Sequence, residues 1–242
     1  MASAITYPTR AGLSAGLAAP FGRADCLSPA SALAGLPQRV IQRGPGSELF
    51  AQDDPCRYIF QLRQGSARAY RLFEDGRRQI VGFYFAGDLF GFEGADTCFT
   101  FAETVTEASL RVWDVTQGGL PAEAMLPLAA ASLRRAQRHM LVLGRQNALE
   151  RVSLFLLELA EHQGGAGTLD LPMSRADLAN HLGLTLETLS RLVSRLRDKG
   201  VIAFKGLRHG RIADAETLRQ YAGLVCASDS ESQVEIRLPK ES

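Results

Sequence analysis

Short runs of alternating apolar and polar residues fill the segment from residue 36 to 120, and each run has the length of a β-strand. The clearest runs are Arg57–Arg63, Ala67–Phe73, Gln79–Phe85 and Ser109–Asp114. Turn signals separate them at Gln64-Gly65, Asp75-Gly76, Ala86-Gly87-Asp88 and Phe90-Gly91. The pattern predicts a small antiparallel barrel or jelly roll of roughly six to eight strands. Because such a barrel encloses a cavity, we expect that it can hold a small molecule.

A helical period replaces this pattern between residues 121 and 146. Strict alternation of steps of three and four residues is typical of helices that pair in a coiled coil, so this segment is predicted to be a dimerisation helix. Pro127 is expected in its first turn, where a missing N–H costs little. The alternative is a helix buried against its own barrel. The predicted dimer seam consists of Leu126, Ala129, Leu133, Ala136, Met140 and Leu143.

The segment 147–225 begins with a further amphipathic helix, predicted from about Ala148 to His162. Residues 173–200 then read MSRADLANHLGLTLETLSRLVSRLRDKG. Ser174 is placed to cap a first short helix, Thr185 a second one, and Gly183 permits the turn between them. Two short helices joined by a glycine turn predict a helix-turn-helix unit, whose second helix lies in the major groove of DNA.

The second of these helices has one apolar and one polar face. Its apolar stripe is Leu189, Val193 and Leu196, with Leu192 beside it, and its polar face is Glu187, Ser190, Arg191 and Ser194. Arginine can form two hydrogen bonds to guanine, and a carboxylate can accept one from cytosine N4. An exposed glutamate would repel phosphates unless it reads a base. We therefore predict that Glu187, Ser190 and Arg191 are the base readers, together with Leu186 at the start of the helix.

Basic residues concentrate around this helix, although the whole chain has a formal charge of only +1. Between Glu187 and Arg211 the sequence has seven basic residues and two acidic ones, as expected of a nucleic-acid footprint on one face. Val201–Lys205 and Arg211–Ala213 are predicted to pair as a β-wing. The alternatives are a solvated basic face and a helical hairpin with a structural role alone. The predicted phosphate contacts are Ser174, Arg175, Thr185, Thr188, Ser194, Arg195, Lys205 and Arg208.

Composition and spacing exclude several other classes. The chain of 242 residues is 46% hydrophobic and 22% charged, which is ordinary for a globular protein. Neither a long apolar run nor a secretory signal is found, so we expect a cytoplasmic protein without a membrane span. Residues 1–35 are rich in Ala, Ser, Gly and Pro and are predicted to be a flexible tail, with a transit peptide as the alternative. Residues 226–242 are predicted to be a second flexible tail.

Cysteine and histidine spacing predicts neither metal nor cofactor. The four cysteines, Cys26, Cys56, Cys98 and Cys226, lie at least thirty residues apart, and we expect reduced thiols. An enzyme built on a cupin-like barrel would need a His/Glu cluster for its metal. The first histidine of the chain is His139, beyond the barrel, so we predict that the protein is not an enzyme.

These motifs resemble the CRP/FNR superfamily of bacterial regulators over roughly residues 36–225. The stretch QGSARAYRLFEDGRRQIVGFYFAGDLFGFE resembles its cyclic-nucleotide-binding-like roll. The stretch LGLTLETLSRLVSRL resembles the recognition helix of the FNR and FixK branches, marked by Glu-x-x-Ser-Arg, whereas the CRP branch has an arginine where Leu186 stands. The resemblance implies an α+β fold with an N-terminal antiparallel β-roll (36–120), a long dimerisation helix (121–146) and a C-terminal winged helix-turn-helix (147–225). It also implies a homodimer that contacts RNA polymerase and binds DNA of the type TTGAT-N4-ATCAA.

Two departures indicate the sub-branch. Cyclic AMP binders have a glutamate just after the Gly-Asp-x-x-Gly turn and an Arg-Ser/Thr pair beyond it. This chain has Phe92 with Glu93 one residue late, and Phe99 and Thr100 at the pair, so a cyclic phosphate would lose its bidentate partner. FNR itself holds an iron–sulfur cluster on a tight N-terminal cysteine group, whereas Cys26 stands alone.

The best match is therefore the FixK-like branch, which reads DNA as FNR does but lacks the cluster. That resemblance implies activation of micro-oxic respiration or nitrogen-fixation genes. The alternatives are a ligand-gated CRP-like regulator that responds to a small molecule and an FNR-like oxygen sensor.

Overall fold

The computed structural model describes residues 33, 35–93, 96–116, 120–165, 167–206 and 208–224. The predicted tail 226–242 lies outside the described residues, and so does the predicted tail 1–35 except for two residues. One of these, Leu33, is fully buried in a cluster with Trp113 and Leu128, so the ordered core begins before the predicted end of the tail. Cys26 and Cys226 also lie outside the described residues.

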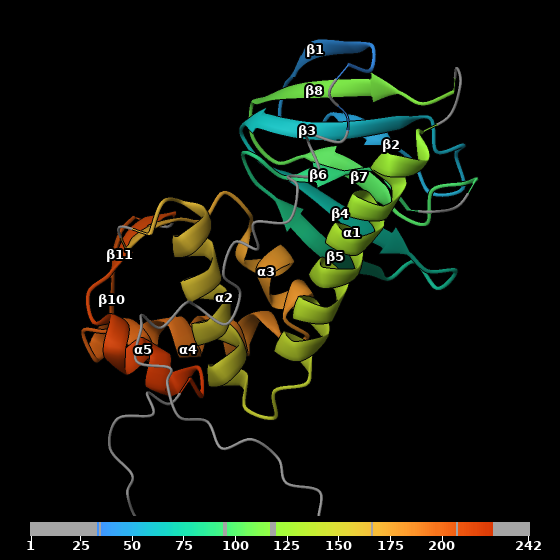
Figure 1. The fold of residues 1–242 in the computed structure, drawn as a ribbon. Helices are drawn as coiled ribbons and strands as arrows, with labels where there is room; N and C mark the ends of the chain where they lie inside the picture. The colour runs from blue at the N-terminus through green and yellow to red at the C-terminus, as the bar shows by residue number, and fades with distance from the viewer. Residues whose placement is uncertain are drawn as a thin grey trace, which may run out of the picture.

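In the described part of the chain, eight strands form two antiparallel four-stranded sheets that face each other (Figure 1). The sheet orders are β1-β8-β3-β6 and β2-β7-β4-β5. The predicted antiparallel roll is confirmed, and the ends of the four clearest predicted strands differ from the observed ends by at most one residue. The strands are β1 (Gln38–Arg43), β2 (Glu48–Phe50), β3 (Tyr58–Gln64), β4 (Ala67–Leu72), β5 (Arg78–Tyr84), β6 (Leu89–Phe90), β7 (Phe101–Thr104) and β8 (Ala108–Asp114).

Aromatic rings occupy much of the space between the two sheets. Phe60 stacks on Phe90 with ring centroids 5.4 Å apart, and Phe90 stacks on Tyr84 at 4.5 Å. Phe50 completes the cluster, with its ring centroid 5.9 Å from that of Phe60 and 6.5 Å from that of Phe90. Burying such large rings stabilises the roll through the area removed from water. These rings occupy part of the space in which the sequence predicts a ligand cavity, so a bound small molecule in the roll stays a prediction.

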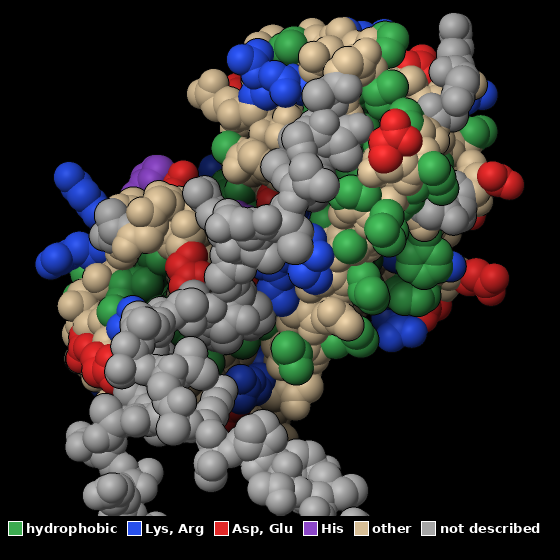
Figure 2. Space-filling model, viewed as in Figure 1, with side chains coloured by type: hydrophobic (Ala, Val, Ile, Leu, Met, Phe, Trp, Pro, Cys, Tyr) green, Lys and Arg blue, Asp and Glu red, His purple; other side chains and the backbone are tan. Residues whose placement is uncertain are grey.

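The helix α1 (Ala122–Leu143) runs diagonally from the roll toward the C-terminal region (Figure 1). It buries Ala124, Leu128 and Val142, whereas the predicted seam is exposed except for Leu143, which is half-buried. Leu126 is 75% exposed and Met140 is 60% exposed, so the apolar stripe is not buried against the roll. Figure 2 shows hydrophobic side chains gathered along this helix.

The prediction that Pro127 lies in the first turn of α1 is wrong. The helix begins five residues earlier, at Ala122, so Pro127 lies inside it. A proline at this position removes one backbone donor from the helix. The heptad pattern therefore located the helix but not its first turn.

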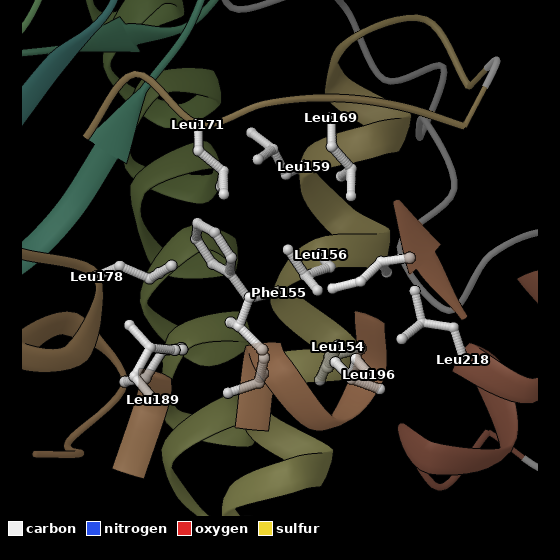
Figure 3. Close-up of a cluster of buried hydrophobic side chains, with 14 of the residues drawn as sticks. Leu154, Phe155, Leu156, Leu159, Leu169, Leu171, Leu178, Leu189, Leu196 and Leu218 are labelled. Carbon is white, nitrogen blue, oxygen red and sulfur yellow. The ribbon is translucent and has the colours of Figure 1, made fainter. Parts of the chain in front are cut away.

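The C-terminal region packs helices around α2, with a small sheet beside them. The sheet has the order β10-β11-β9, so β9 adds a third strand to the predicted two-stranded wing. Figure 3 shows side chains of α2, α3, α4 and α5 pointing into one core. The elements are α2 (Ala148–His162), β9 (Thr168–Asp170), α3 (Arg175–His181), α4 (Leu186–Asp198), β10 (Ile202–Lys205), β11 (His209–Ile212) and α5 (Ala215–Tyr221).

A polar junction joins α3 to the roll. The carboxylate of Asp177, with its side chain 4% exposed, accepts hydrogen bonds from Arg68 of β4 and from Arg78 of β5, the latter at 2.5 Å. The side chain of Asn180 accepts from the N–H of Ile80 at 2.5 Å and donates to the carbonyl of Arg78 at 2.7 Å. These contacts place the first helix of the helix-turn-helix unit against the edge of β5.

A histidine is buried at the same junction. The ring of His181 stacks on His139 with centroids 4.3 Å apart and lies 5.1 Å from the ring of Phe83. Burial lowers the pKa of His181 to about 3, because a charged imidazole would lose its hydration there. The ring is therefore neutral at pH 7, which suits its apolar surroundings.

The first prediction concerns the charged junction. Asp177→Asn should lower the free energy of unfolding by about 2–4 kcal/mol, because two partly buried guanidinium groups lose their shared charge partner. Urea unfolding at fixed protein concentration measures the loss. Asp75→Asn is the matched control, since it breaks an exposed pair with Arg77 that should contribute less than about 1 kcal/mol. Equal effects of the two substitutions would contradict the assigned role of Asp177.

The second prediction concerns pH. Unfolded His181 takes up a proton below its ordinary pKa of 6.5, whereas the folded ring stays neutral down to about 3. Stability is therefore lost as the pH falls through this window. In His181→Phe, which keeps an aromatic ring, that loss is absent, so wild-type stability should fall relative to the variant by about 2 kcal/mol between about pH 7 and pH 5. Urea unfolding at both pH values measures the difference, and a constant difference would show that the folded ring titrates normally.

Candidate nucleic-acid interface

Local capping defines the two helices of the helix-turn-helix unit. The hydroxyl of Ser174 accepts the N–H of Asp177 at 3.0 Å and caps α3. The hydroxyl of Thr185 accepts the N–H of Thr188 at 3.1 Å and caps α4. Between them Gly183 has φ +63°, in the left-handed region that favours glycine, so the chain turns tightly. Both predicted caps and the glycine turn are confirmed.

The apolar face of α4 anchors the helix. Leu189 and Leu196 are 0% exposed and Val193 is 9% exposed. Figure 3 shows that Leu189 points toward Phe155 of α2. Because α4 follows a 3.6-residue period, burying this stripe turns the opposite stripe to solvent. Accordingly Glu187, Ser190 and Arg191 are exposed, and Ser194 is half-buried.

Two of the predicted base readers form an ion pair with each other. The guanidinium of Arg191 donates to the carboxylate of Glu187 at 2.5 Å, one helical turn away, and both side chains are more than two-thirds exposed. Such an exposed pair contributes little to stability, because water screens it. It therefore holds the two groups next to each other but opens easily when a stronger partner approaches. Leu186, at the start of the helix, is 49% exposed.

The predicted phosphate contacts at the start of α3 have other partners in the structure. The hydroxyl of Ser174 also donates to the carboxylate of Asp177 at 2.8 Å. The guanidinium of Arg175 lies 5.2 Å from the ring centroid of Phe204 on β10. Burial lowers the pKa of Arg175, and its Nη1 atom is buried without a hydrogen-bond partner among the described residues. Arg175 thus packs on the wing, and its contact with a phosphate stays a prediction.

The remaining predicted phosphate contacts on α4 lie along its outer side. The hydroxyls of Thr185 and Thr188 lie 2.8 Å apart, and Arg195 is exposed. Ser190, Arg191, Ser194 and Arg195 line one open hollow, together with Asp198 and Lys199, which the sequence reasoning did not single out as site residues. The hollow places charged donors beside the predicted base-reading face, as expected of a helix that lies in a groove of DNA.

The wing extends this basic surface beyond α4. Lys205 pairs with His209 at its tip, so β11 begins two residues before the predicted Arg211. Gly210 is required in that strand, since a Cβ there would lie 2.6 Å from the carbonyl oxygen of Ala203. Lys205 and Arg208 are exposed, and Figure 2 shows basic side chains standing out from the side of the molecule where the wing lies.

The described residues also bear on three other features: a metal site, a membrane-spanning helix and a cyclic-nucleotide site. They contain no group of three or more His, Cys, Asp or Glu side chains arranged to hold a metal ion. In the same part of the chain, no helix is both long enough and apolar enough to cross a membrane. In the roll, the carboxylate of Glu93 accepts the N–H of Phe99 and the hydroxyl of Thr100. The two residues that the resemblance aligns with the Arg-Ser/Thr pair are thus a phenylalanine and a threonine that both bond the carboxylate of Glu93.

Comparisons with known proteins agree with this architecture. Residues 41–121 match the model of the cyclic nucleotide-binding domain, and residues 150–221 match that of the Crp-like helix-turn-helix domain. The chain is similar to the nitrogen fixation regulation protein FixK of Rhizobium meliloti (strain 1021), with 43% identity over 183 residues that cover 76% of this chain and 87% of that protein. It is 33% identical to the fumarate and nitrate reduction regulatory protein of Escherichia coli (strain K12) over 199 residues, 77% of this chain and 78% of that one.

A solved structure shows the same fold. The structure of FixK2 from Bradyrhizobium japonicum matches with a TM-score of 0.72 and 36% identity, covering 77% of this chain and 98% of that chain. The roll, the long helix and the helix-turn-helix unit are therefore shared with proteins that are also similar in sequence. The chain belongs to the CRP/FNR family of transcription regulators, as its Glu-x-x-Ser-Arg helix and its roll had indicated.

Proposed function

We propose that this protein is a FixK-like homodimeric regulator that binds palindromes of the type TTGAT-N4-ATCAA and activates genes for micro-oxic respiration or nitrogen fixation. The observation that carries the proposal is the exposed face of α4, on which Glu187, Ser190 and Arg191 lie opposite a fully buried stripe. The similarity to two proteins named nitrogen fixation regulation protein FixK supports the pathway.

The ion pair on α4 suggests how the half-site is read. TTGAT contains a single G·C pair, and in the major groove guanine offers two acceptors while cytosine offers the N4 donor. Arg191 and Glu187 lie within 2.5 Å of each other, so they can bind the guanine and the cytosine of that one base pair. Ser190, on the same face, is left for a neighbouring base. In the free protein the carboxylate of Glu187 is paired with Arg191, and in the DNA complex it would accept a hydrogen bond from cytosine. At neither stage would it face a DNA phosphate without a partner.

The basic groups around α4 supply affinity without sequence preference. Arg195 on α4 and Lys205 and Arg208 on the wing are exposed and lie outside the base-reading triplet. Each cation that neutralises a phosphate releases condensed counterions, so such contacts weaken as salt rises. We assign these residues to positioning on the DNA backbone and the triplet to specificity.

The exposed stripe of α1 supports a dimer. Leu126, Leu133 and Met140 are 75%, 58% and 60% exposed in the single chain, and they repeat at heptad spacing. An apolar stripe of this kind costs free energy in water, and pairing with a second copy of the helix would bury it. A two-fold symmetric dimer in turn matches a palindromic DNA site. RNA polymerase and a cytoplasmic location complete the proposal by family resemblance.

The alternative functions predict different measurements. A CRP-like sensor needs an arginine for the cyclic phosphate, whereas this chain has Phe99 and Thr100 at the positions of the Arg-Ser/Thr pair. Heat of binding in a calorimetric titration of the protein with a cyclic nucleotide would favour the CRP-like sensor. A visible iron–sulfur absorption band in the purified protein would favour the FNR-like oxygen sensor.

The third prediction separates base reading from phosphate contact. Arg191→Ala should lower affinity by about 1–3 kcal/mol per half-site and relax preference mainly at the G·C pair. Arg208→Ala, the matched control, should weaken binding to cognate and scrambled DNA alike and reduce the salt dependence by about one phosphate contact. Titrations of TTGAT-N4-ATCAA and its single-base variants at several salt concentrations give both quantities. Equal loss for Arg191→Ala on every sequence would show that this side chain reads no base.

The fourth prediction concerns the dimer. Replacing both Leu133 and Met140 by glutamate should give monomers, because four carboxylates would meet in the paired seam, and DNA affinity should fall with dimerisation. Sedimentation equilibrium gives the oligomeric state. Arg134→Glu introduces the same side chain on the exposed flank of α1 outside the seam, and it should leave the dimer intact. A double variant that still sediments as a dimer would place the interface elsewhere.

A further inference from the structure

Two cysteines that lie far apart in the sequence meet in the roll. Cys56 precedes β3 and Cys98 precedes β7, with 42 positions between them. Their Sγ atoms lie 2.9 Å apart, and both thiols are free. The roll lies at the opposite end of the molecule from α4, so the pair is separate from the proposed DNA interface (Figure 1).

The backbone, and not only the two side chains, holds the pair together. An isolated antiparallel bridge joins Pro55 to Thr97, one residue from each cysteine. The N–H of Cys56 donates to the carbonyl of Asp96 at 2.9 Å, which locks the two segments side by side. On the other side of the bridge, the N–H of Cys98 donates to the carbonyl of Asp54 at 2.8 Å. The backbone pairing therefore holds the two sulfur atoms 2.9 Å apart, and they need to approach by less than about 1 Å to reach the length of an S–S bond.

The two thiols differ in access. Cys98 is 3% exposed, whereas Cys56 is half-buried and reaches the surface. The short distance between the two sulfur atoms, together with the access to Cys56, favours thiol chemistry at this pair. We propose that Cys56 and Cys98 form a reversible oxidation site that takes a small-molecule disulfide, such as oxidised glutathione, and closes to an intramolecular disulfide.

The reaction balances with that oxidant alone. The thiolate of Cys56 attacks one sulfur of the small disulfide, whose S–S bond breaks, and the first small thiolate leaves with the electron pair. The thiol of Cys98 then loses its proton to water and its sulfur attacks Sγ of Cys56. The Cys56–Cys98 bond forms and the second small thiolate leaves. The protein dithiol is oxidised by two electrons, and the small disulfide is reduced to two thiols that take up the two protons.

The surroundings of the pair set its rate. Burial raises the pKa of both thiols, and Glu93, Asp96 and Asp54 add to the increase because carboxylates disfavour a nearby thiolate. At neutral pH only a small fraction of Cys56 is thiolate, so oxidation is slow. Its rate should rise about tenfold per pH unit while the pH stays below the pKa of the attacking thiol.

The experiment uses the full chain with Cys26 and Cys226 replaced by serine, so that only the pair remains. After incubation with oxidised glutathione, intact-mass measurement should show the loss of two hydrogens, and non-reducing digestion should yield one peptide pair joined through Cys56 and Cys98. The melting temperature should rise by about 5–10 °C, because the bond closes a long loop, and reductant should reverse both changes.

Single variants test the assigned order of attack. Cys98→Ser should stop at a stable glutathione adduct on Cys56, whereas Cys56→Ser should leave the buried Cys98 unmodified. If the parent protein carries two glutathione groups, links two chains or stays reduced at elevated pH, the proposal is overturned. Because the mass measurement on the parent protein stands without the single variants, a variant that fails to fold does not remove the test.

Discussion

The orientation of the DNA-reading face depends on the burial of the opposite face of α4 in the core around α2. That core is continuous: it runs from Leu189 and Leu196 through Phe155 to Ile80 and Phe83 of the roll. Full burial of one such side chain stabilises the fold by about 1.5–3 kcal/mol, more than an exposed ion pair can contribute. Apolar packing therefore determines where α4 points, and the charged groups on its surface remain free to exchange partners.

The ion pairs of Asp177 fix the position of α3 against the roll more closely than apolar packing alone would. Arg68 and Arg78 both bond its carboxylate, so α3 has one favourable position along the edge of β5. A buried ion pair is weak evidence for net stability, because desolvation offsets much of the attraction. Its effect here is on register: sliding α3 along β5 would separate Asp177 from both guanidinium groups and leave Arg68 only its pair with Glu103 on β7. The second helix of the helix-turn-helix unit is thus held relative to the roll, and the proposed dimer would need this to read two half-sites.

Local patterns foretold much of the C-terminal region. The helix from Ala148 to His162 was predicted with the bounds that the structure shows, and the caps at Ser174 and Thr185 were read from a few letters each. The stripe that would be buried on α4, and hence the face left for Glu187 and Arg191, followed from the helical period alone. Such features are predictable because capping and periodicity depend on residues within one or two turns of each other.

Contacts between distant segments of the chain could not be predicted from such local patterns. The local sequence gives no sign of the partners of Asp177, because Arg68 and Arg78 lie about a hundred positions away. The three-residue strand β9 was missed, since it is defined by pairing with β11 and not by its own sequence. The sequence by itself thus determined the helices, their caps and the polar face of α4, because the interactions that stabilise them are local. Only the tertiary structure decided that aromatic rings pack between the sheets of the roll, that α3 docks on β5 and that Cys56 meets Cys98, because each of these requires two chain segments to be brought together by the packing of the whole fold.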